Sequence, residues 1–150
     1  MSETKIKDRF EHFSLALFNI SHYWNRIAGD EMKKHGLKGA YALYLITLYN
    51  HPEEEITAAR LSGLCKRDKA DVSRAITSFQ KKGIAQPFGE SRYRAPIRLT
   101  AAGMEIARQL INRAGQVIEV TGRTMSDEMR SHLYQCLDII SLNMEELCEK

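Results

Sequence analysis

Residues 57–100 of the chain read TAARLSGLCKRDKADVSRAITSFQKKGIAQPFGESRYRAPIRLT, and this stretch decides the fold. It begins with Thr57, a residue type that caps helix N-termini. The apolar residues that follow have helical spacing as far as Cys65, which predicts a short first helix. Residues 66–68, Lys-Arg-Asp, then form a polar turn.

A second helix is predicted directly after this turn. Asp68 can act as its N-cap, and Asp71 at the third helical position would complete an acidic variant of a capping box. The helix is expected to run to Lys82, because Gly83 readily takes the left-handed conformation that closes a helix. Two short helices joined by a tight turn form a helix-turn-helix.

The flanking segments extend this unit on both sides. Residues 37–49 predict one helix, which ends at the break before Pro52. After the second helix, residues 84–87 predict a strand, residues 89–91 a turn and residues 92–99 a returning strand. Three helices followed by a β-hairpin make a winged helix-turn-helix, so the fold class is mainly α.

The second helix of the stretch has two contrasting faces. Positions 100° apart place its apolar residues on the side that must pack on a core: Val72, Ala75, Ile76 and Phe79. The opposite face carries Ala70, Ser73, Arg74, Thr77 and Lys81. Small residues at the start allow close approach to a groove floor, and Arg74 can offer a two-pronged donor to guanine or reach a phosphate. A polar helix face that is merely solvated remains the alternative.

The returning strand has a basic side. Strand alternation would put Tyr93, Ala95, Ile97 and Leu99 on one face and Arg92, Arg94, Pro96 and Arg98 on the other. Pro96 cannot donate to a sheet ladder, which indicates an edge strand. The tip could enter a minor groove or lie along phosphates. Edge charges that only prevent aggregation are the alternative.

Positive charge is concentrated in this part of the chain. Residues 57–99 contain ten Lys or Arg and three Asp or Glu, a local excess of +7 in a protein whose net charge is +3. Clustered positive charge on a helix-turn-helix with a basic hairpin is the electrostatic footprint of DNA binding. We expect three of the ten to play no direct part in binding: Arg60, Lys82 and Arg98.

Long apolar seams occupy the two ends of the chain. Alternating spacings of three and four residues run through the first helix at Ile6, Phe10, Phe13, Leu17, Ile20, Trp24 and Ile27. A helix capped by Thr100 carries a similar seam, as does a last helix capped by Ser126 with Leu133, Leu137, Ile140, Met144 and Leu147. These helices could pack within one monomer or interleave between two chains. The regular seam and the advantage of a two-fold pair on DNA favour a homodimer.

Three segments resemble the MarR (multiple antibiotic resistance regulator) family: KRDKADVSRAI at 66–76, KGI at 82–84 and IRLTAAG at 97–103. The resemblance implies a homodimeric transcriptional regulator whose recognition helices enter successive major grooves of a pseudo-palindromic operator while the wings grip flanking DNA. We expect it to act mostly as a repressor that blocks access to a promoter, with activation as the alternative. The family usually has Asp-x-Arg at the wing tip, where this chain has Ser91 and Tyr93.

The resemblance covers the whole chain, residues 1–150, with a winged-helix unit at 37–100 and a helical dimerisation region at 5–30 and 101–149. Ten residues are predicted to contact double-stranded DNA: Lys66, Arg67, Lys69, Ala70, Ser73, Arg74, Thr77, Lys81, Arg92 and Arg94. Relatives often bind aromatic or amphipathic effectors where the bundle meets the winged unit. The aromatic candidates for such a pocket are Phe18, His22, Trp24, Tyr41 and Tyr44.

Composition excludes several other classes of protein. At 150 residues, with 43% hydrophobic and 27% charged residues, the chain has the make-up of one soluble domain. It shows no secretory signal and no apolar run long enough to span a membrane, and its three cysteines favour a reduced, cytoplasmic protein. Dispersed histidines predict no metal site or cofactor, and nothing resembles a catalytic constellation. A winged-helix protein-interaction or assembly module without DNA binding remains the alternative function.

Overall fold

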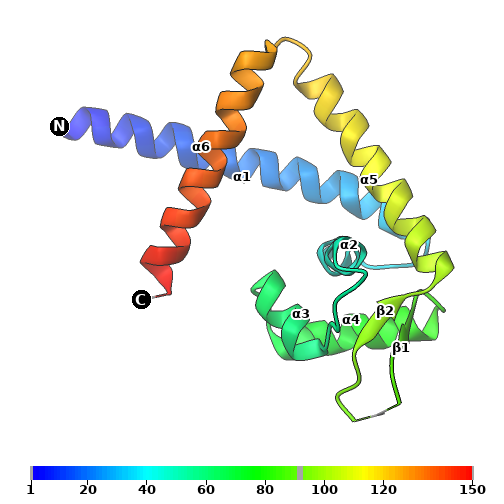
Figure 1. The fold of residues 1–150 in the computed structure, drawn as a ribbon. Coiled ribbons are helices and arrows are strands. Elements are labelled where there is room, and N and C mark those ends of the chain that lie inside the picture. Colours follow the sequence, from blue (N-terminus) through cyan, green and yellow to red (C-terminus); the bar gives the residue numbers. More distant parts are fainter. Residues whose placement is uncertain (1, 91–92, 150) are drawn as a thin grey trace. The chain divides into compact units, whose positions relative to one another are not determined.

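The computed structural model describes residues 2–90 and 93–149 and is mainly helical (Figure 1). The chain divides into two compact units, residues 1–113 and 114–150. Within the described residues the elements are, in chain order, α1 (Glu3–Lys33), the 3₁₀ helix η1 (Gly39–Tyr41), α2 (Ala42–Asn50), α3 (Ala58–Cys65), α4 (Lys69–Lys81), β1 (Ala85–Pro87), β2 (Ile97–Leu99), α5 (Ala101–Thr121) and α6 (Asp127–Cys148).

The helix-turn-helix forms as the caps predict. The Thr57 side chain accepts from the amide of Arg60 at 3.1 Å, and the Asp68 carboxylate accepts from the amide of Ala70 at 3.3 Å. Between the two helices Lys66 takes the left-handed conformation with φ 52°. The buried Ser62 hydroxyl donates to the carbonyl of Arg67 and so fixes the end of the turn.

The helix predicted at 37–49 differs in the structure. Its first residues form no α-helix: a 3₁₀ turn at 39–41 precedes α2, which begins at Ala42. The reason is a close backbone contact, because a Cβ on Gly39 would lie 2.8 Å from the Cα of Gly29 in α1. Glycine at 39 therefore lets this segment pack directly on α1, at the expense of helix propensity.

One hydrophobic core lies beneath α4. All four residues predicted for its inner face are buried, and Val72, Ala75 and Phe79 are fully so. The largest fully buried side chains around them come from α1, α2, α3 and the segment before α3: Met32, Tyr44, Leu45, Ile56 and Leu61. The core fixes the rotation of α4 about its axis, and this rotation decides which residues face solvent.

The wing is shorter than predicted. β1 pairs with β2 in antiparallel register over three residues, Ala85 opposite Leu99 and Pro87 opposite Ile97, and the amide of Ile97 donates to the carbonyl of Ile56 at 2.7 Å. The prediction of a strand over 92–99 was wrong for its described outer part. Arg94 has a left-handed φ of 49°, which breaks the alternation of a strand.

The side chains of the wing only partly follow the alternation that was predicted. Tyr93, which alternation places on the same face as Ile97, is 76% exposed, whereas Ile97 is buried. The guanidinium of Arg94 lies over its ring, 5.1 Å from the centroid. Arg98 lies over the ring of Phe88 at 3.3 Å. Arg92 and Ser91, which the predictions also involved, are outside the described residues.

The base of the wing is joined to the start of α5. The Thr100 hydroxyl donates to the carbonyl of Gly83 at 2.6 Å and accepts from the amide of Gly103 at 3.1 Å. Gly103 lies directly against the carbonyl of Ile84, where a Cβ would clash with the oxygen and lie 3.0 Å from the carbonyl carbon. The sequence TAAG at 100–103 is therefore both a helix cap and a contact surface.

The unit at 114–150 contains the end of α5 and all of α6. The Ser126 hydroxyl caps α6 by accepting from the amide of Met129 at 3.2 Å, as predicted. Arg130 closes the connection by donating to the carbonyl of Gly122 at 3.0 Å.

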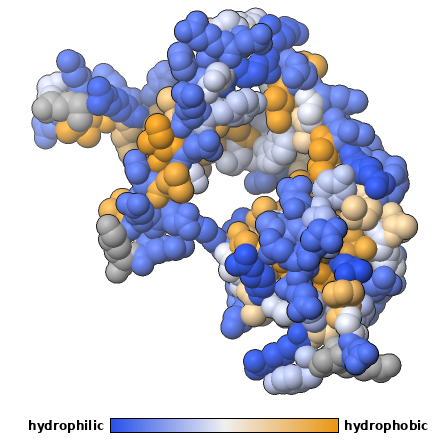
Figure 2. All heavy atoms as spheres, viewed as in Figure 1, coloured by the Kyte–Doolittle hydropathy of each residue, from blue (hydrophilic) through white to orange (hydrophobic). Residues whose placement is uncertain are grey.

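Both terminal helices carry large apolar side chains that are exposed in the single chain. On α1 these include Ile6, Phe10, Phe13, Leu17 and Ile20. On α6 they include Leu133, Leu137, Met144 and Leu147. Figure 2 shows hydrophobic residues at the surface of each helix. No helix in the described part of the chain is long and apolar enough to cross a membrane.

Candidate DNA-binding surface

The outward face of α4 is the centre of the candidate surface. Each of the five residues predicted there is exposed: Ala70, Ser73, Arg74, Thr77 and Lys81. The helix has its small residues near the start, a long cation in the middle and a second cation in its last turn. Such a face presents little bulk at one end and donors for bases or phosphates along its length.

The turn before α4 adds further positive charge. Lys66, Arg67 and Lys69 are exposed around the N-terminus of the helix. The left-handed conformation of Lys66 ends α3 and starts the turn within a single residue. These cations surround a helix end whose backbone amides favour an anion such as a phosphate.

The wing meets α4 at a shallow groove. Ser73, Thr77 and Gln80 form one side of this groove, and Pro87 and Ala95 contribute to the other. Its volume is about 240 Å³. The structure thus brings the outer face of α4 and the described part of the wing together, with Arg94 exposed at the wing.

Arg74 is not independent of the residues around it. Its guanidinium donates to Oδ1 of Asp71 at 3.3 Å, and the other carboxylate oxygen of Asp71 accepts from the hydroxyl of Tyr44 at 2.5 Å. The prediction that Asp71 completes a capping box was wrong, since its carboxylate turns to α2 and to Arg74 instead. A polar atom at Tyr44, within an apolar run, was the only sequence signal for this contact.

The pKa values of Tyr44 and Asp71 follow from their contacts with each other and with Arg74, and these three residues are called the trio below. Burial, assisted by the hydrogen bond to Asp71, raises the pKa of Tyr44 to about 12. The hydrogen bond from Tyr44 and the contact with Arg74 lower the pKa of Asp71 below its ordinary value. At neutral pH the hydroxyl is therefore protonated and donates, and the carboxylate is ionised and accepts from both sides.

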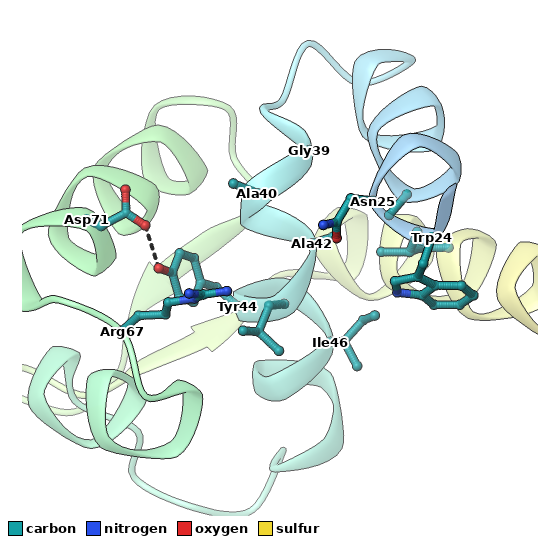
Figure 3. Close-up of a pocket in the computed structure, with 12 residues that line it drawn as sticks. Trp24, Asn25, Gly39, Ala40, Ala42, Tyr44, Ile46, Arg67 and Asp71 are labelled. Carbon is teal, nitrogen blue, oxygen red and sulfur yellow. Dashed lines mark hydrogen bonds between the residues drawn. The ribbon is translucent and has the colours of Figure 1, made fainter. Parts of the chain in front are cut away.

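A cavity of about 760 Å³ lies beside this trio (Figure 3). Tyr44 and Asp71 line it together with Arg67 from the turn, and Trp24 and Asn25 from α1. Two of the five aromatic candidates, Trp24 and Tyr44, are thus cavity residues. The other three do not line it: Phe18, His22 and Tyr41.

The possible metal ligands and the thiols are the remaining side chains to place in the described part of the chain. No group of three His, Cys, Asp or Glu side chains there could hold a metal ion. Cys65 is buried with its sulfur 3.3 Å from the hydroxyl of Thr47, whereas Cys136 and Cys148 are exposed on α6.

No protein-family profile and no curated protein sequence matches the chain. Solved structures do match it. A MarR transcriptional regulator from Methanosarcina mazei Go1 superimposes with a TM-score of 0.80 at 22% identity, over 91% of this chain and 92% of that one. A MarR protein from Peptoclostridium difficile gives a TM-score of 0.78 at 21% identity, over 89% and 88%. The Staphylococcus aureus MepR–DNA complex gives 0.74 at 16% identity, over 88% and 96%.

These matches span nearly the full length of both partners in each comparison. The chain therefore has the winged helix-turn-helix fold of MarR regulators, as its sequence predicted. At these identities the likeness concerns the fold.

Proposed function

We propose that this chain is a MarR-type, sequence-specific DNA-binding transcriptional regulator. The observation that carries the proposal is the outward face of α4. Core packing turns Ser73, Arg74 and Thr77 to solvent, and the exposed cations of the preceding turn lie around the same helix end. A face of this kind fits the major groove, where α-helices read base edges. The solved MepR–DNA complex has the same fold, which supports this use of it.

The regulator is proposed to act as a homodimer on a pseudo-palindromic operator. The apolar seams of α1 and α6 support this, because each remains uncovered in the single chain. Exposed apolar rows on long helices are typical of subunit interfaces. A two-fold pair would present two α4 helices to successive major grooves. Bound in this way over a promoter, the dimer would repress transcription.

Release by a small aromatic or amphipathic effector is the last part of the proposal. The cavity beside α4 supports it, because its wall combines the apolar Trp24 with the polar groups of Asn25 and Arg67. A ligand there would touch Asp71, which is bonded to Arg74. A ligand with unequal affinity for the DNA-bound and free forms would shift the equilibrium between them.

The test is direct binding to duplex DNA. Duplexes selected from a random library by the purified protein would be titrated in fluorescence anisotropy over a series of salt concentrations. We expect Arg74→Ala to relax the sequence preference. Lys81→Ala should weaken binding evenly and reduce the salt slope by about 0.9 for each protomer. Arg108→Ala removes an exposed charge on α5 and serves as the matched control. No duplex binding at low salt would refute the proposal and favour a protein-interaction module.

A further inference from the structure

We propose that Tyr44 and Asp71 are positioning residues that hold Arg74 in the orientation from which it reads a base pair. This inference rests on the proposed function and adds a specificity determinant that lies partly in the protein core. Its basis is a continuous chain of hydrogen bonds from a buried ring through a carboxylate to an exposed guanidinium.

The outer hydrogen bond of the series, between Arg74 and Asp71, is weak by itself. Arg74 and Asp71 are three residues apart on α4, their side chains are 62% and 36% exposed, and the nitrogen and oxygen are 3.3 Å apart. Exposed pairs of this kind contribute little, because water competes for both partners and a long side chain loses freedom. An isolated pair would leave the guanidinium in many orientations.

The inner hydrogen bond, between Tyr44 and Asp71, restricts the orientation of the Arg74 guanidinium. The Tyr44 side chain is 1% exposed and packed in the core, so its hydroxyl has one position. That hydroxyl donates to Oδ2 of Asp71 at 2.5 Å, which leaves Oδ1 directed at Arg74 (Figure 3 shows the inner contact). The Asp71 carboxylate is thereby held by a rigid donor on α2. Because the carboxylate has a fixed position, it also fixes the position of the Arg74 guanidinium.

Fixing Asp71 also serves a second purpose. A free carboxylate on this face would approach DNA phosphates and could accept from cytosine. Engaged from both sides, Asp71 has its acceptor capacity directed at Tyr44 and Arg74. The preorganised guanidinium then binds a base with less loss of side-chain freedom than a mobile one. Discrimination at one base pair should therefore depend on the Tyr44 hydroxyl.

The experiment compares Tyr44→Phe with a matched control. Tyr41→Phe removes the hydroxyl of a tyrosine that is also buried, at 4% exposure, but whose ring packs on Phe79. Dissociation constants are measured for the selected duplex and for one altered at the base pair where Arg74→Ala loses discrimination. The discrimination ratio is the dissociation constant for the altered duplex divided by that for the selected duplex. Tyr44→Phe should lower this ratio about tenfold. Tyr41→Phe should leave the ratio unchanged.

Two further measurements separate positioning from a structural role. In the double variant Tyr44→Phe/Arg74→Ala, discrimination should fall no further than in Arg74→Ala alone, because Tyr44 acts through Arg74. Binding of Tyr44→Phe to an unrelated duplex, and its salt slope, should stay within twofold of the parent's. A retained ratio in Tyr44→Phe, an additive loss in the double variant, or equal weakening on every duplex would overturn the proposal.

A readout without DNA keeps this inference distinct from the proposed function. The order parameter of the Arg74 Nε–H group, measured by NMR in the free protein, should fall in Tyr44→Phe and in Asp71→Asn but not in Tyr41→Phe. An unchanged order parameter would overturn the positioning role. If the parent bound no duplex, the proposed function would fail, and the role in base reading with it. The NMR result would then still decide whether Tyr44 holds Arg74.

Discussion

Replacing Gly103 by alanine should destabilise the junction between the wing and α5, although alanine is the better helix former. A Cβ at this position would clash with the carbonyl oxygen of Ile84 and lie 3.0 Å from its carbon. Both are backbone atoms, so no side-chain rotation can relieve the clash. The first turn of α5 must move away, which also disturbs the hydrogen bonds of Thr100 to Gly83 and Gly103.

The magnitude follows from three opposing contributions. Overpacking against a rigid neighbour costs about 1–3 kcal/mol. A weakened Thr100 hydrogen bond costs about 1 kcal/mol more. Alanine regains about 1 kcal/mol of helix propensity over glycine. The free energy of unfolding should therefore fall by about 1–3 kcal/mol in Gly103→Ala.

Gly115 provides a control in the same helix. It is an exposed position inside α5, and a Cβ there would meet no atom within 4 Å. Gly115→Ala should therefore raise the free energy of unfolding by about 1 kcal/mol. Urea unfolding followed by circular dichroism, at one fixed protein concentration, measures both variants. A Gly103→Ala variant as stable as the parent would refute the contact argument.

Two other predictions concern the subunit interface and pH. Leu137→Glu should shift the protein from dimer to monomer in sedimentation, because it places a charge in the exposed seam of α6. Gln135→Glu on the same helix is the control and should leave the dimer intact. A Leu137→Glu dimer of unchanged affinity would show that this seam is not part of the interface. The lowered pKa of Asp71 means that its stabilising effect is present above the unfolded value near 3.8 and is lost as pH falls through the lower folded value. Carboxyl NMR titration should show this pKa rising in Tyr44→Phe, and an unchanged pKa would contradict the hydrogen bond.

Local rules were sufficient for the helix-turn-helix because its signals lie within a few residues of their effects. The caps at Thr57, Asp68 and Ser126 form as predicted, and the 100° periodicity of α4 identifies its buried face. Each of these features depends on groups in the same helix turn or on a pattern repeated within one helix. The order of the remaining elements likewise followed from apolar spacing and turn residues, and the resemblance to MarR regulators agreed with it.

The predictions failed where distant residues decide the conformation. Alternation predicts a strand over the whole of 92–99, but the paired register ends at Pro87 opposite Ile97, and one further backbone hydrogen bond runs from the amide of Phe88 to the carbonyl of Pro96. Beyond it Arg94 adopts a left-handed conformation. Asp71 was assigned to a cap three residues away, yet its carboxylate is bonded to a hydroxyl 27 residues earlier in the chain. No local pattern contains that pairing.

Counting charges alone overstates how strongly this surface should respond to salt. If all ten basic residues between 57 and 99 met phosphates, the salt slope would be about −9 for each protomer. Two of them are engaged elsewhere, since Arg60 lies 3.6 Å from Glu54 and Arg98 lies over Phe88. Without these and Lys82, the seven cations predicted to contact DNA give a slope of about −6 for each protomer. Because Arg74 is assigned to a base, the measured slope should be smaller still. A slope near −9 for each protomer would mean that charge, rather than the shaped face of α4, governs binding.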